Sequence, residues 1–108
     1  MSGQSGWVCR TYPDGAVEAE GAVLGGSRHG HWVFHYPTGA IESEGDYRFG
    51  HKDGVWRYWY AEDRPWFEAT YHLGRYHGAY REWSRLGGLR LEIEYDSGRV
   101  AFEKRHQG

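Results

Sequence analysis

The chain has little of what builds disulfide-bonded, secreted or membrane-spanning proteins. Its 108 residues include one cysteine, Cys9, which excludes an internal disulfide framework and is typical of a reducing compartment. No apolar run approaches the roughly 18 residues that a membrane span needs. The first residues, MSGQSG, lack the basic and apolar regions of a secretory signal. The sequence therefore predicts a soluble, cytoplasmic protein.

An excess of charge of one sign is also missing. The chain has 13 lysines and arginines against 15 aspartates and glutamates, and its net charge is −2. Acidic and basic residues alternate along the sequence, so no extended basic surface is expected. Such a surface is the electrostatic requirement for binding nucleic acid or an anionic membrane. We therefore expect neither of these partners.

Helical periodicity does not develop anywhere, and 17 glycines are too many for long helices. The sequence is rich instead in aromatic residues, with 6 tryptophans and 9 tyrosines. Each buried aromatic side chain removes about 150–250 Å² from water. A few large side chains therefore supply the core of a small single domain, in a size range where stability is marginal.

A repeat of 24 residues organises the chain. One column of glycines begins the units, one column of glutamates lies inside them, and a second glycine column lies near their ends. The columns are Gly6, Gly30, Gly54 and Gly78; Glu20, Glu44, Glu68 and Glu92; and Gly26, Gly50, Gly74 and Gly98. A fixed period of this length indicates a repeat array. We expect units at 6–29, 30–53, 54–77 and 78–101, a disordered tail at 1–5, and a C-terminal edge or tail at 102–108, where the pattern breaks.

Each unit carries the signals of a β-hairpin. In the second unit an aromatic and β-branched run, residues 31–36, leads into the turn residues Pro37 to Gly39. A second alternating run, residues 41–47, ends at a turn around Phe49 and Gly50. The sequence predicts an all-β protein, a single elongated antiparallel meander of about eight short strands.

The size of the side chains predicts the hairpin register. With a four-residue loop at 37–40, the large rings near the strand starts face small residues, whose bare backbone they can cover. The expected facing pairs are Tyr36–Ile41, Phe34–Ser43, Trp32–Gly45, Tyr60–Pro65, Tyr58–Phe67, Trp56–Ala69 and Tyr80–Ile93. A slip of one residue would move these rings beside Glu42 and Glu44, on the acidic side.

The opposite face is then polar, with Val33–Glu44, Arg57–Glu68 and Arg81–Glu92 as facing pairs. Three tryptophans break this rule. The same register makes Trp59 face Trp66, and Trp83 face Arg90 in a cation–π contact. Exposed aromatic patches rimmed by charge mark interaction sites. We predict a partner-binding site of Trp59, Trp66 and Trp83 with Arg57, Arg81 and Arg90 as its rim. The alternative is that a curved sheet or an inverted register turns these rings inward.

The columns resemble a known family of β-hairpin repeats. Gly30, Trp32, Tyr36, Gly39, Glu44, Tyr47 and Gly50 are similar to the pattern of the MORN-repeat variant, found in bacterial proteins that include YwqK-type antitoxins. The resemblance covers residues 6 to about 100 and implies that the columns form the structural frame. The frame residues are Gly30, Gly54, Gly78, Trp32, Trp56, Tyr80, Tyr36, Tyr60, Glu44, Glu68 and Glu92. The better-known MORN repeats have a second glycine where this chain has Trp32, Trp56 and Tyr80. The lipid-linked roles of those proteins are therefore not implied.

No catalytic or metal site is expected. Seven histidines are present, but no cysteine or carboxylate recurs with them at ligand spacing, so we expect no metal and no cofactor. The glutamate column repeats in every unit, whereas a catalytic site needs a unique constellation. Cys9 lacks a basic neighbour in sequence other than Arg10. The chain is not expected to be an enzyme.

These observations predict a non-catalytic repeat scaffold that binds another protein. The family resemblance implies a bacterial antitoxin or immunity protein that occludes a toxin domain. The alternative is a self-assembling structural module, a homo-oligomer formed through its sheet edges or its aromatic face. Binding of a small ligand or carbohydrate on the aromatic face is a third possibility.

Overall fold

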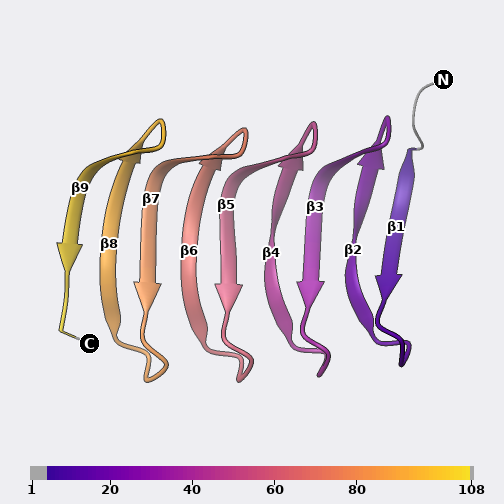
Figure 1. Ribbon diagram of the computed structural model, residues 1–108, viewed down its shortest axis with the longest axis horizontal. Coiled ribbons are helices and arrows are strands. Elements are labelled where there is room, and N and C mark those ends of the chain that lie inside the picture. The colour runs from indigo at the N-terminus through magenta and orange to yellow at the C-terminus, as the bar shows by residue number, and fades with distance from the viewer. Residues whose placement is uncertain (1–4, 108) are drawn as a thin grey trace.

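A computed structural model describes residues 5–107 and shows one antiparallel sheet whose nine strands follow chain order (Figure 1). The strands are β1 (Gly6–Thr11), β2 (Val17–Leu24), β3 (Ser27–His35), β4 (Ile41–Arg48), β5 (His51–Trp59), β6 (Pro65–His72), β7 (Arg75–Trp83), β8 (Leu89–Asp96) and β9 (Arg99–Arg105). These residues contain no helix, and the molecule measures 49 × 33 × 14 Å, so the sheet is a single layer. The predicted all-β meander is confirmed.

The two ends of the chain extend the predicted pattern. Nine strands form where about eight were expected, because β9 pairs with β8 along the stretch at which the repeat breaks. Residues 1–4 of the predicted disordered tail, and Gly108, lie outside the described residues. Ser5 is described, and its Oγ accepts a hydrogen bond of 3.2 Å from the backbone N–H of Gly25.

The connections between consecutive hairpins are tight turns that use left-handed backbone. Phe49 and Gly50, between β4 and β5, have φ angles of 51° and 83°, and the other turns between hairpins share this pattern. Positive φ at both central residues is typical of type I′ hairpin turns, whose twist matches that of the strands. Side chains also hold these turns. Asp53 Oδ1 accepts a bond of 3.2 Å from the N–H of Leu73, and His77 Nδ1 one of 3.0 Å from Ser97.

The predicted register is confirmed in the middle of each hairpin. Facing pairs found as expected are Trp32–Gly45, Phe34–Ser43, Trp56–Ala69, Tyr58–Phe67, Tyr80–Ile93, Val33–Glu44, Arg57–Glu68 and Arg81–Glu92. Hairpins of the same shape therefore recur along the sheet.

The predicted register is wrong next to the turns inside each unit. His35, not Tyr36, faces Ile41, and Trp59, not Tyr60, faces Pro65. Gly39 adopts a φ of 97°, and Tyr36 donates its N–H to Ala40 O at 2.8 Å, so the loop has three residues and not four. In the strand that follows each of these loops, one residue then has no facing residue and forms a bulge.

A second irregularity follows the unit-starting glycines. Between the pairs Gly21–Trp32 and Val23–Arg28, one residue of β2 faces three of β3, and Gly30 lies among these three with a φ of 77°. The same shift recurs around Gly54 and Gly78. In β9, where Phe102 replaces the glycine, the register shifts by one residue only, between Glu94–Phe102 and Tyr95–Val100. The large shift thus accompanies a residue that tolerates positive φ.

The core lies on one side of the sheet, which we call the aromatic face and which carries Trp32, Tyr47 and Trp56. Trp32 and Trp56 are 1% and 0% exposed, although no second layer covers them. Each indole lies against a glycine of the preceding unit, Gly21 or Gly45, at which there is no room for a Cβ atom.

The indole N–H groups are bonded on the same side. Trp32 donates to Ala22 O at 2.7 Å and Trp56 donates to Asp46 O at 2.8 Å. We expected each ring to cover the small residue that it faces within its own hairpin. This expectation is wrong, because the indoles lie over the preceding unit instead. This overlap joins consecutive units through their core side chains.

Candidate functional site: an aromatic cleft on the charged face

The opposite side of the sheet, which we call the charged face, carries a ladder of ion pairs across β5 to β9. Arg57 and Glu68 pair at 3.6 Å, Glu68 and Arg81 at 3.1 Å, and Arg81 and Glu92 at 3.6 Å. His106 Nε2 lies 2.8 Å from Glu92 at the end of the ladder. The pairs predicted within hairpins are present, and Glu68–Arg81 is an additional pair that links two units.

The ladder acts on the protonation of its last carboxylate. The hydrogen bond from His106, together with Arg81, lowers the pKa of Glu92 below its usual range, although partial burial opposes this shift. The groups at this end of the sheet therefore favour the charged form of Glu92.

Trp59 and Trp83 end their strands at equivalent positions of the repeat, and the preceding unit holds the backbone of each. The hydroxyl of Tyr36 donates to Trp59 O at 2.6 Å, and that of Tyr60 donates to Trp83 O at 2.8 Å. Each bond ties the backbone at a strand end to the preceding unit. The two tryptophans are thus positioned by the frame and not by a loose loop.

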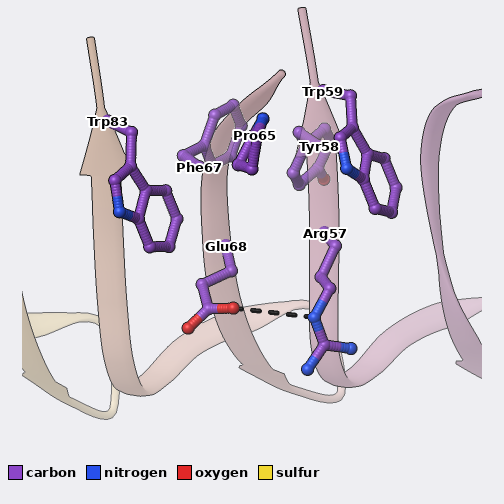
Figure 2. A pocket seen from close by; sticks show the side chains of 7 residues that line it. All are labelled: Arg57, Tyr58, Trp59, Pro65, Phe67, Glu68 and Trp83. Atoms are coloured by element: carbon purple, nitrogen blue, oxygen red, sulfur yellow. Dashed lines mark ion pairs between the residues drawn. The ribbon is translucent and has the colours of Figure 1, made fainter. Parts of the chain in front are cut away.

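Between these tryptophans lies an open cleft of about 160 Å³ (Figure 2). It is lined by Arg57, Tyr58, Trp59, Pro65, Phe67, Glu68 and Trp83. Figure 2 shows the two indoles on either side of β6, with the Arg57–Glu68 ion pair toward one end of the cleft. Pro65, the first residue of β6, lies between the two indoles in this view. The cleft therefore has two aromatic walls and a charged end.

The structure separates Trp66 from this cleft. Trp66 occupies the bulge, so Trp59 faces Pro65 and not Trp66. Its ring stacks on Tyr60 at a centroid distance of 5.5 Å and meets the edge of Phe67 at 4.9 Å, and it is 38% exposed. The three tryptophans predicted to cluster are therefore a pair and a separate residue.

A bulge also separates Arg90 from Trp83, its expected partner. Trp83 faces Leu89, so the predicted cation–π contact of Trp83 with Arg90 is wrong. Arg90 is exposed and holds the C-terminal end of β9 through its carbonyl, which accepts a bond of 2.7 Å from His106 N–H. Arg57 lines the cleft. Arg81 is not a lining residue, but it forms an ion pair with the lining residue Glu68.

The cleft has the chemistry of a side-chain receptor. Indole walls bind flat apolar groups, and they also attract cations. Arg57 and Arg81 pair with Glu68, and Arg81 also pairs with Glu92, so positive and negative charges balance at the charged end. A large apolar side chain with polar neighbours matches this arrangement.

Within residues 5–107 no three histidine, cysteine, aspartate or glutamate side chains are grouped so that they could hold a metal ion. His31 lies 3.1 Å from Asp46, while His29 packs on Phe49 at a centroid distance of 5.8 Å. Nothing in the described part of the chain forms a helix long and apolar enough to cross a membrane. Comparisons with protein-family models and with curated protein sequences give no match.

Proposed function

We propose that this chain is a non-catalytic repeat scaffold that binds another protein, and that the cleft between Trp59 and Trp83 receives a side chain of the partner. The main support is the pairing of these two indoles across β6, on the face that carries the ladder of ion pairs. Aromatic anchors in a cleft with a polar rim are typical of the residues that dominate protein–protein affinity.

The family resemblance supports a more specific proposal. Proteins with similar hairpin units include antitoxins, so the partner would be a toxin domain and the chain an immunity-type protein that occludes it. A single-layer sheet suits this role because it presents a long surface on a frame that the tryptophan and tyrosine columns hold in place.

The test is capture of a partner from the source organism, identified by mass spectrometry and then purified for a binding assay. Trp59→Ala with Trp83→Ala should leave the circular-dichroism spectrum unchanged and weaken binding by at least a hundredfold, as expected for two hot-spot residues. His35→Ala is the matched control, because His35 has the equivalent position one unit earlier and its carbonyl is bonded by Tyr12 at 2.6 Å. Equal binding by the double variant would contradict the proposed site.

Self-assembly is a second candidate, favoured by the outer edge of β9. Val100 and Phe102 are 55% and 58% exposed there, and an unpaired strand edge templates association. The bulge in β9 and its charged residues Lys104 and Arg105 oppose this. Light scattering over a concentration series separates the two candidates, since a strict monomer contradicts self-assembly.

A further inference from the structure

Two cations lie over the buried tryptophans on the aromatic face, one repeat apart. The guanidinium of Arg28 is 4.7 Å from the Trp32 ring centroid, and its Nη1 lies 3.3 Å from Tyr47 Oη. The ammonium of Lys52 is 4.7 Å from the Trp56 ring and donates to Tyr58 Oη at 2.7 Å. Each charge is held by an aromatic ring and a phenol, and is thus fixed before any ligand arrives.

Neither cation has a carboxylate partner. Among the described residues, the ion pairs formed on the sheet involve other arginines and histidines, and none includes Arg28 or Lys52. The two charges therefore keep their capacity to bind an anion.

An open basin of about 230 Å³ lies between the two cations. Its lining residues are Arg28, Phe34, Glu42, Ser43, Tyr47, Lys52, Trp56 and Tyr58. Ser43 is 4% exposed, at a position where the other units have Ala19, Phe67 and Leu91. A buried hydroxyl in an otherwise apolar column gives the basin a hydrogen-bonding group that the rest of the array lacks.

Strand β7 shows that the frame does not need a cation at this position. Tyr76 in β7 replaces Lys52 and stacks on Tyr95 at a centroid distance of 4.8 Å. A tyrosine can therefore cover the neighbouring rings in place of a cation. The same strand also lacks the aromatic ring found at Phe34 and Tyr58, because the equivalent residue there is Glu82. The paired cations belong to one place on the face, where Arg28 of β3 and Lys52 of β5 flank β4.

We propose that this basin binds a small ligand in which an anionic group is attached to a single flat ring. Arg28 and Lys52 contact the anionic group, which is a carboxylate or a phosphate, while Phe34 and Tyr58 contact the ring. A cavity of about 150 Å³ is enough to hold benzene, so the basin has room for one ring and its anionic substituent. The two cations lie on the opposite face from Trp59 and Trp83, and the basin and the tryptophan cleft share one lining residue, Tyr58.

The experiment titrates the full chain with four probes and follows the indole N–H signals by NMR. Benzoate and phenyl phosphate carry both features, benzyl alcohol carries the ring alone, and inorganic phosphate carries the charge alone. We expect saturable shifts of the Trp56 signal with at least one of the first two, and binding at least tenfold weaker with the last two. Preference for benzoate assigns a carboxylate ligand, and preference for phenyl phosphate assigns a phosphate. Equal binding of benzyl alcohol, or no saturable shift with any probe, overturns the proposal.

Charge variants test the two cations directly. Lys52→Met keeps an apolar stem over Trp56 and should weaken the preferred probe five- to tenfold, as expected for loss of one charge-assisted contact. Glu42→Gln removes the carboxylate at the rim and should strengthen binding about twofold, because like charges repel. Arg48→Met is the control, since Arg48 lies near Phe49, outside the basin, and should have no effect.

Unchanged affinity in Lys52→Met, with a thermal midpoint near that of the parent chain, overturns the proposal. The double variant of Trp59 and Trp83 should bind the probe normally. Failure of the protein-partner experiment and failure of this one are therefore distinguishable.

Discussion

The second and third units differ from the fourth in how a ring is buried on a single-layer sheet. Trp56 covers Gly45 and is fully buried, whereas in the fourth unit Tyr80 faces Ala69 across the unit boundary and stays partly exposed. The Tyr80 hydroxyl donates to Glu82 Oε1 at 2.9 Å, and burial and this carboxylate raise the pKa of Tyr80. Complete burial of an indole without a second layer thus depends on bare backbone in the preceding strand.

The same two regions differ in the bonds between units. Tyr12, Tyr36 and Tyr60 each donate to a carbonyl 23 residues further along. Ser84 has this position in the fourth unit, and its Oγ accepts a bond of 3.2 Å from Gly88 N–H in its own turn. The first three units are each bonded to the following unit, whereas the side chain at this position in the fourth unit is bonded within its own turn.

The largest expected effect comes from giving the second unit, at Gly45, the alanine that the third unit has at the equivalent position, Ala69. Gly45→Ala places a methyl group where the Trp56 ring lies, and overpacking of this kind costs about 1–3 kcal/mol. We expect the free energy of unfolding, measured in urea, to fall by about 2–3 kcal/mol because Trp56 must also leave its site.

The compensating variant sharpens this comparison. Gly45→Ala with Trp56→Tyr reproduces the Ala69–Tyr80 combination and should recover part of the loss. Ala69→Gly is the control, and at a position already occupied by alanine it should cost only about 0.5–1 kcal/mol. A double variant less stable than Gly45→Ala would contradict the proposed dependence of ring size on the covered residue.

A smaller effect is expected where the units are tied forward. Tyr36→Phe removes the hydroxyl that bonds Trp59 O and should lower the free energy of unfolding by about 1 kcal/mol. It should also increase amide exchange at the end of β5. Ser84→Ala, whose bond lies within its own turn, should leave exchange at the other units unchanged. Equal exchange in both variants would show that the tyrosine column does not join units.

The smallest effect concerns pH at the C-terminal end of the ladder. Because the folded-state pKa of Glu92 is lowered, its contribution is present above the unfolded-state value of about 4.3 and is lost as the pH falls through the lower folded value. Glu92→Gln should therefore flatten the acid side of the stability curve, with little change in its shape near pH 9. An unchanged acid limb, measured by thermal unfolding from pH 2 to 6, would contradict this assignment.

The repeat and the meander could be predicted because the glycine and glutamate columns keep their spacing in the sequence. The middle of each register was also predictable, since only one register puts Trp32 opposite Gly45 and away from Glu44. The direction in which an indole leans was not predictable, because the strands on both sides offer small residues. The direction of the indole depends on how side chains of neighbouring units pack together, and the residue pattern within one unit does not contain that information.

The composition of the candidate site was half predictable. Trp59, Trp83 and Arg57 lie together as expected, but Trp66 and Arg90 fall on bulges. One signal was available, because Gly39 three residues after Tyr36 is typical of a three-residue loop with a left-handed last residue. That loop shortens the hairpin by one residue and makes Glu42 and its equivalents extra. No such signal predicted the basin of Arg28 and Lys52, because only the folded sheet brings these two residues to the same basin.

The odd number of strands has a consequence for how the array can grow. Strands β1 and β9 run in the same direction at opposite edges of the sheet (Figure 1). A translated second molecule placed beside β9 would therefore need a parallel pair, although every other neighbour in the sheet is antiparallel. A twofold axis through that edge avoids the conflict by pairing β9 with β9, and a second twofold axis can pair the β1 strands in the same way. An odd number of strands thus favours neighbours related by twofold axes over neighbours related by translation.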